Sequence, residues 1–171
     1  GHQAPESSLS WIAAGSGRLV EQQTVPDAQL SIRHLALAPT GEVAIGLRRY
    51  PSAASARCVA MAKAGEGIKL LSAADTIQSQ LQGLALSVAI DPVRRRVVAT
   101  HPDGGRLTFW NLDDGGLITA TAVPLAEGVA RLPSGDWLVT SQDSALRVVS
   151  AQSGAITPWP GAGLNWKHAI A

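Results

Sequence analysis

The sequence predicts an all-β fold in which β-propeller blades of four antiparallel strands make up about half a ring. Two observations predict it: a repeat with a period near 40 residues, and short apolar runs separated by turns rich in glycine and proline. The chain has 171 residues, of which 46% are hydrophobic, and this is enough for the core of one domain. We expect a tail or cloning remnant at 1–7 and a single partial propeller at 8–171.

Three segments carry the repeat: RHLALAPTGEVAIGL (33–47), LSVAIDPVRRRVVAT (86–100) and EGVARLPSGDWLVTS (127–141). Each consists of an apolar run, a turn led by proline and a second apolar run, as expected for the inner strands of a blade. RLTFWNLDDGGLITATAV (106–123) and ALRVVSAQSGAITPW (145–159) each contain two apolar runs joined by a Gly-bearing turn. This pattern is typical of hairpins and indicates the outer strands.

Both ends of the chain carry incomplete copies. The segment 8–25 has the pattern of an outer hairpin, and WKHAIA at 166–171 has that of an innermost strand. The sequence therefore predicts three full blades with a partial blade at each end. One short helix is expected within 72–83, with Ser72 or Asp75 as its N-cap.

Candidate binding residues follow from the phase of the repeat. The innermost strands of a propeller line its central channel, where residues in phase converge. The phased positions are His34, Ser87, Gly128 and His168, and Arg33 beside His34 offers a guanidinium fork for a carboxylate or phosphate. We therefore predict a ligand site in the channel formed by Arg33, His34, Ser87 and His168.

Other interpretations of these residues stay open. His34 could instead bond a backbone carbonyl and simply fill the channel mouth. A metal site needs three or four ligands, and two histidines without a Cys or acidic partner at fixed spacing do not specify one. A hydrolase would need acidic groups around the axis, but the inner strands supply only Asp91 and Glu127, which are out of phase with His34. A scaffold is thus favoured over an enzyme, and no cofactor is expected apart from a metal at the histidines.

Several further side chains have expected structural roles. Cys58, in the alternating run ARCVAMA, is expected to pack in the core. His101 lies in THPDGG, a turn, and is expected to be exposed. Trp11, Trp110 and Trp137 fall in strand patterns, where we expect them to pack between blades.

Charge and motif content narrow the function classes. The net charge of +1 provides no strong field for nucleic acid or anionic lipid, so neither partner is expected. The basic groups at 48–49 and 94–96 adjoin turns and are expected to be solvated. No run approaches the roughly 18 apolar residues of a membrane helix, and phosphate-loop, nucleophile-elbow and zinc-protease motifs are absent from the sequence.

A family resemblance rests on four blocks, which occur in the order LSIRHLALAPTGEVAIG, LSVAID, FWNLDDGGL and GVARLPSGDWLVTS. The chain resembles the C-terminal half of the DUF1513 proteins, a bacterial family related to YVTN and WD40-like propellers. The resemblance implies a propeller of the seven-bladed type, exported to the periplasm and often encoded near imelysin-like and dihaem-oxidoreductase proteins. It thereby suggests an alternative function, a metal-handling or redox accessory of an iron-related periplasmic system that uses channel histidines.

The leading prediction is a non-catalytic, periplasmic scaffold that binds a protein or a small anionic ligand at the central channel. Half a ring would expose strand edges and apolar faces. We therefore expect a homodimer that closes the ring, or a separate chain that carries the missing half, together with a periplasmic protein partner.

Overall fold

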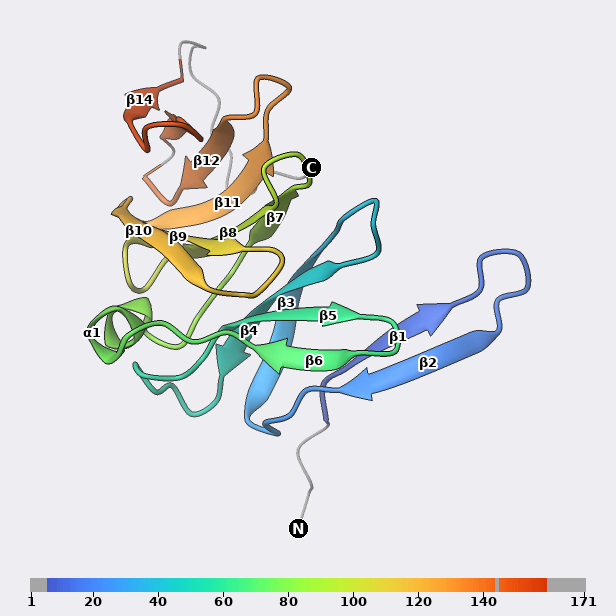
Figure 1. Cartoon of the computed structure of the whole chain (residues 1–171). Coiled ribbons are helices and arrows are strands. Elements are labelled where there is room, and N and C mark those ends of the chain that lie inside the picture. The colour runs from blue at the N-terminus through green and yellow to red at the C-terminus, as the bar shows by residue number, and fades with distance from the viewer. Residues whose placement is uncertain (1–5, 144, 160–171) are drawn as a thin grey trace.

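The structure is a computed structural model that describes residues 6–143 and 145–159. Within these residues the chain forms antiparallel β-sheets and one short helical segment, as the repeat predicts (Figure 1). The predicted fold class is confirmed. Residues 1–5 of the expected tail and the expected fourth-copy strand at 166–171 lie outside the described residues.

Each predicted blade corresponds to one sheet, and its strands pair in sequence order. The first sheet has two strands, β1 (Ser8–Ile12) and β2 (Leu19–Thr24). The second contains β3 (Leu30–Leu37), β4 (Val43–Arg49), β5 (Val59–Lys63) and β6 (Gly67–Leu70). The third contains β7 (Val88–Asp91), β8 (Arg96–His101), β9 (Arg106–Asn111) and β10 (Leu117–Ala122). The fourth contains β11 (Ala126–Arg131), β12 (Trp137–Ser141), β13 (Leu146–Val149) and β14 (Ile156–Pro158).

The helical segment lies between the second and third sheets and is shorter than the predicted span. It consists of α1 (Asp75–Gln78) and the single 3-10 turn η1 (Ser79–Leu81). Leu81 is fully buried and Ile77 packs against the same core, so the predicted apolar pair does face inward. In Figure 1 this segment covers the outer side of the molecule, away from β3 and β7.

The N-cap expectation was wrong. Ala74 occupies the N-cap position, and neither Ser72 nor Asp75 caps the helix; Asp75 is its first residue. The side chain of Gln78 instead reaches back, where its Oε1 accepts the N–H of Ala73 at 3.1 Å. This bond from inside the helix orders the chain that enters it.

The hydrophobic core lies between the sheets, in three layers. Leu9 and Trp11 of the first sheet pack against Ile45 and Leu47 of the second. Further layers join the second sheet to the third and the third to the fourth, with Trp110 and Trp137 almost fully buried in them, respectively. The expectation that these three tryptophans pack between blades is confirmed.

Strand direction alternates along each sheet, so the loops gather at two ends of the molecule. At one end, which we call the Pro-turn end, lie the loops that follow β3, β7 and β11 and contain Pro39, Pro92 and Pro133. At the other, the blade-link end, lie the connections between sheets at 25–29, 71–87 and 123–125 and the loops after β4, β8 and β12.

Candidate ligand site at the inner strands

The first strands of the three four-stranded sheets lie side by side. β3 contacts β7, and β7 contacts β11 (Figure 1). Each is the inner edge strand of its own sheet. This is the arrangement that the phase of the repeat predicts, and it brings residues more than 50 positions apart in sequence into contact.

His34 and Ser87 meet where these strands converge. Nδ1 of His34 accepts the backbone N–H of Val88 at 3.0 Å and lies 3.2 Å from Oγ of Ser87. The same Oγ accepts the N–H of Val129 at 3.3 Å. Because Nδ1 is an acceptor, the Ser87 hydroxyl donates to it and the imidazole proton sits on Nε2. One histidine thus links three neighbouring blades.

Two threonines on the second strands of their sheets form further bonds to the inner strands. Oγ1 of Thr100, in β8, accepts the N–H of Ser87 at 3.0 Å and donates to the carbonyl of Glu127 at 2.6 Å. Oγ1 of Thr140, in β12, accepts the N–H of Gly128 at 2.9 Å. These threonines stand 40 residues apart, as the repeat requires, although sequence reasoning did not single them out. Side-chain bonds to backbone groups therefore hold the inner strands in register.

Arg33 takes a different direction from the one expected. The β3–β4 register shifts between Ile32 and His34, which leaves Arg33 as an extra residue in a β-bulge. Its Nη2 donates to the hydroxyl of Tyr50 at 2.6 Å. The structure thus joins His34 to Ser87 but places Arg33 beside Tyr50, and His168 lies outside the described residues.

Tyr50, the only tyrosine in the chain, holds two guanidinium groups. Those of Arg33 and Arg48 lie 5.3 and 5.0 Å from the centre of its ring. In the described part of the chain neither group forms an ion pair. We call Arg33, Arg48 and Tyr50 the arginine–tyrosine cluster; among the described residues, no carboxylate pairs with its two positive charges.

The expectation that His101 is exposed was wrong. It is the last residue of β8 and points between the sheets, where it is fully buried. Its Nδ1 donates to the carbonyl of Leu84 at 2.7 Å, and its Nε2 lies 2.8 Å from the hydroxyl of Thr108. That hydroxyl also accepts the indole N–H of Trp110 at 2.8 Å. His101 is therefore a core residue with both ring nitrogens satisfied.

Cys58 is buried against His101, with Sγ 3.6 Å from Nδ1. Burial raises the pKa of the Cys58 thiol to about 12 and lowers the pKa of His101 to about 4. Both groups are neutral at pH 7, so the pair does not supply a thiolate nucleophile. The expectation that Cys58 packs in the core is confirmed.

The sequence suggested that the arginines at 94–96 stand free in solvent. The structure shows instead that they connect blades. Arg95 binds Glu42 of the neighbouring sheet at 2.9 Å and Asp113 at 2.6 Å. Asp91, which is fully buried, lies 3.0 Å from Arg94 and 3.2 Å from Arg131 of the next sheet. Two of these ion pairs, Arg95–Glu42 and Arg131–Asp91, thus cross blade boundaries.

Comparison with known proteins identifies one family and several solved structures of similar fold. The family described as "Protein of unknown function (DUF1513)" matches residues 2–170. The chain belongs to the DUF1513 family. No curated protein matches this DUF1513 chain.

Solved structures of propeller-like proteins superpose on the DUF1513 chain at low sequence identity. "Structure of U3-55K" matches 92% of this chain and 47% of that chain, with a TM-score of 0.70 at 11% identity. "Dihydro-heme d1 dehydrogenase NirN in complex with DHE" matches 93% and 34%, with a TM-score of 0.66 at 19% identity. Kuenenia stuttgartiensis hydrazine synthase matches 74% and 34%, with a TM-score of 0.59 at 10% identity. The chain thus spans less than half the length of these proteins, and the likeness is one of fold.

Two features of the described residues bear on other functions. No helix among them is long and apolar enough to cross a membrane. Among residues 6–143 and 145–159, no three His, Cys, Asp or Glu side chains are grouped so that they could hold a metal ion. Because His168 is outside these residues, the metal-handling alternative stays a prediction.

Proposed function

We propose that this DUF1513 chain is a non-catalytic propeller scaffold that binds a small anionic ligand beside its inner strands, at the arginine–tyrosine cluster. The observation that carries the proposal is the pair of guanidinium groups beside Tyr50, which have no carboxylate partner among the described residues. Two like charges beside the same ring repel each other, and a nearby anion relieves the repulsion. Arginine presents a planar donor fork that matches the oxygens of a carboxylate or phosphate.

The rigid inner strands support the same proposal. The bonds between His34, Ser87 and Val129 fix β3 against its neighbours, so Arg33 projects from a strand that is held in place. A donor on a rigid element loses little conformational entropy when a ligand binds. The backbone at the site is therefore already arranged for binding.

Calorimetric titration with inorganic phosphate at constant ionic strength tests the proposal. We expect the wild-type chain to bind phosphate, and Arg33→Ala and Arg48→Ala each to weaken binding by about tenfold, since a charge-assisted hydrogen bond contributes roughly 1.5–3 kcal/mol. Arg33→Lys retains the charge but not the donor fork, so its phosphate affinity should fall between those of the wild type and Arg33→Ala.

Arg18→Ala is the matched control, because Arg18 is an exposed arginine in the β1–β2 turn at the Pro-turn end. Its removal changes the net charge equally but should leave phosphate affinity unaltered. Equal affinity in the wild type, Arg33→Ala and Arg48→Ala, or no binding to the wild type, contradicts the proposal.

The ring itself is proposed to be completed by further blades, from a second copy of this chain or from a separate chain. Leu35 and Leu37 on β3 pair with Ile45 and Val43, so they face the side of the two-stranded sheet. Yet they are 42% and 70% exposed, unlike their buried partners. An apolar strand face of this kind is a typical interaction surface.

Light scattering after gel filtration checks this arrangement. If two copies close the ring, the purified chain should elute with twice the mass of one chain, and Leu37→Ser should shift it toward a single copy. A soluble single copy at all concentrations, unaffected by Leu37→Ser, contradicts ring completion by either kind of partner.

Periplasmic location is proposed on the family resemblance. Fractionation of bacteria that express the natural gene product provides the test, because an exported protein is released by osmotic shock. Retention of the protein with cytosolic markers contradicts this part of the proposal.

A further inference from the structure

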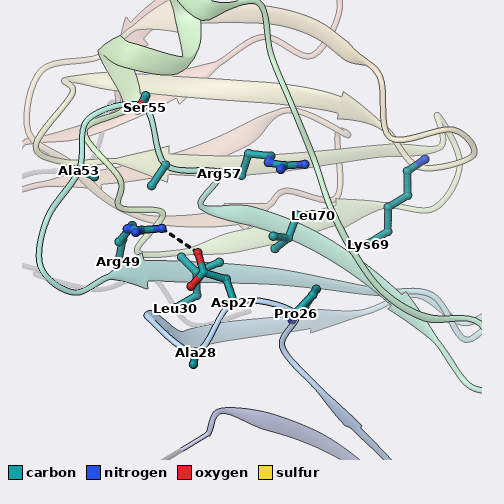
Figure 2. A pocket seen from close by; sticks show the side chains of 11 residues that line it. Pro26, Asp27, Ala28, Leu30, Arg49, Ala53, Ser55, Arg57, Lys69 and Leu70 are labelled. Atoms are coloured by element: carbon teal, nitrogen blue, oxygen red, sulfur yellow. Dashed lines mark hydrogen bonds and ion pairs between the residues drawn. The ribbon is translucent and has the colours of Figure 1, made fainter. Parts of the chain in front are cut away.

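A cleft at the blade-link end of the second sheet is separate from the arginine–tyrosine cluster. It has a volume of about 950 Å³ and lies between the 25–29 connection and the loop that joins β4 to β5 (Figure 2). Binding sites for small molecules usually have volumes of 300–1,000 Å³. The cleft is therefore large enough for a compact organic molecule.

The walls of the cleft are tied to the rest of the fold. The N–H of Tyr50 donates to the carbonyl of Gln29 at 2.8 Å and joins the two loops that form the walls. The side-chain amide of Gln78, which is buried, donates to the carbonyl of Ala56 at 2.8 Å. This bond fixes the loop between β4 and β5 to α1. The cleft is thus formed before any ligand binds, which lowers the entropic cost of binding.

Two cations at the cleft, Arg57 and Lys69, form no ion pair within the described residues, and the ammonium of Lys69 donates to the carbonyl of Asp114 at 2.6 Å. Asp27 accepts from Nη1 of Arg49 at 2.7 Å through Oδ2 and from the N–H of Gln29 at 2.9 Å through Oδ1. Arg57, on the wall that faces Asp27 in Figure 2, has no ion pair within the described residues. The polar side of the cleft therefore carries a net positive charge with unused donors.

Apart from Ser55 and Lys69, the remaining lining is apolar. Leu30 and Leu70, both part of the layer between the first two sheets, form its floor together with Pro26. Figure 2 shows these three side chains near the Arg49–Asp27 pair and below Arg57. A ligand that fits must combine an anionic group with an apolar body, because a fully hydrated ion would leave the apolar floor uncovered.

We propose that this cleft binds a small organic monocarboxylate, with its carboxylate on Arg57 and its apolar body against Leu30 and Leu70. The site does not depend on the arginine–tyrosine cluster, since no residue is shared between them. Inorganic phosphate is a poor ligand for this cleft, because it has no apolar part.

Calorimetry with benzoate tests this inference, with benzyl alcohol as a neutral molecule of similar shape. We expect benzoate to bind the wild type about tenfold or more tightly than benzyl alcohol, since the alcohol forms no charge-assisted bond with Arg57. Arg57→Ala should weaken benzoate binding by a similar factor and bring the two molecules to similar affinity.

A second variant tests the site by volume rather than charge. Ala28 is an exposed residue of the cleft, and Ala28→Trp should fill the space while both arginines stay in place. It should abolish benzoate binding, whereas Arg18→Ala should leave it unchanged. Thermal unfolding of each variant shows whether it is folded before titration.

The proposals for the two sites can be contradicted independently. Arg33→Ala should leave benzoate affinity unchanged, and Arg57→Ala should leave phosphate affinity unchanged. Absence of benzoate binding, equal affinity for benzyl alcohol, or wild-type benzoate affinity in Arg57→Ala or Ala28→Trp would overturn the inference and leave the arginine–tyrosine cluster unaffected.

Discussion

Two groups of arginines at opposite ends of the molecule have different partners, although Arg49 and Arg147 at the blade-link end form ion pairs as well. At the Pro-turn end, Arg95 and Arg131 bind Glu42 and Asp91 across blade boundaries, and Arg94 binds Asp91 within its own sheet. At the blade-link end of the second sheet, Arg33 and Arg57 have no carboxylate partner in the described part of the chain, and they face Tyr50 and a cleft. Paired charges fix one blade against the next, whereas unpaired charges beside a cavity are available to a ligand. We infer that the Pro-turn end holds the blades together and that the blade-link end binds ligands.

The largest effect is expected at Asp91, the fully buried carboxylate of the Pro-turn end. Asp91→Asn should lower the free energy of unfolding by about 1.5–3 kcal/mol, because it weakens the charge-assisted bonds from Arg94 and Arg131 to a fully buried carboxylate. Urea denaturation measures the change.

Asp143→Asn is the control for Asp91→Asn. Asp143 pairs with Arg147 at the blade-link end, but its side chain is 40% exposed, so its loss should cost no more than about 1 kcal/mol. Similar losses in the two variants would remove the distinction between the ends.

The next largest effect on stability is expected at Ser87, because its hydroxyl connects three blades. Ser87→Ala removes one partner of His34 and one of the N–H of Val129 and should cost about 1–2 kcal/mol. Ser52→Ala, in the exposed β4–β5 loop, should have no measurable effect. A double-mutant cycle with His34→Ala should give a coupling of about 0.5 kcal/mol or more; additivity would show that the two side chains do not interact.

Acid titration sharpens the comparison further. Bonds from Thr40 and Arg95 hold the pKa of Glu42 at about 2, below its ordinary value of 4.5. A carboxylate whose folded pKa is depressed stabilises the protein above the unfolded pKa and loses this contribution as pH falls through the folded pKa. Stability should therefore decline between pH 4.5 and pH 2.

Glu42→Gln isolates this contribution from other carboxylates. The variant should be less stable than the wild type by about 1 kcal/mol at pH 7, and the difference should vanish near pH 2. A difference that is constant across this range would mean that the Glu42–Arg95 pair does not stabilise the interface.

The smallest effects on stability are expected at the proposed binding residues. Arg33→Ala and Arg57→Ala should each change the free energy of unfolding by less than about 0.5 kcal/mol, since neither arginine is part of an ion pair among the described residues. Urea denaturation without ligand checks this. A loss above 1 kcal/mol in either variant would indicate a structural role for that arginine.

The sequence was most informative where the repeat applies. Its phase predicted that His34 and Ser87 approach each other across 53 residues, because equivalent strands of successive blades converge on one axis. The same repeat located the strand pairs and the buried tryptophans. It could not reveal the β-bulge that turns Arg33 toward Tyr50, since a bulge depends on local register and not on residue pattern.

Contacts between loops were also beyond the sequence. His101 directly precedes Pro102 and resembles a turn residue, yet the end of β8 carries its ring into the core. The ion-pair partners of Arg94 and Arg95 are Asp91 at the end of β7, Asp113 in the turn after β9, and Glu42 in the turn of the neighbouring sheet. Only the contact with Glu42 depends on how neighbouring blades stack. The cleft depends in the same way on the bond between Gln78 and Ala56, 22 residues apart.

The unfolding free energy in phosphate and in chloride, at equal ionic strength, tests the division between the ends most directly. At a phosphate concentration ten times the dissociation constant, binding should stabilise the wild type by about 1.4 kcal/mol. Arg95→Ala should be less stable in both buffers but retain this increment. The double variant Arg33→Ala, Arg48→Ala should match the wild type in chloride and lose the increment. An increment of equal size in all three proteins would contradict the assignment of binding to the blade-link end.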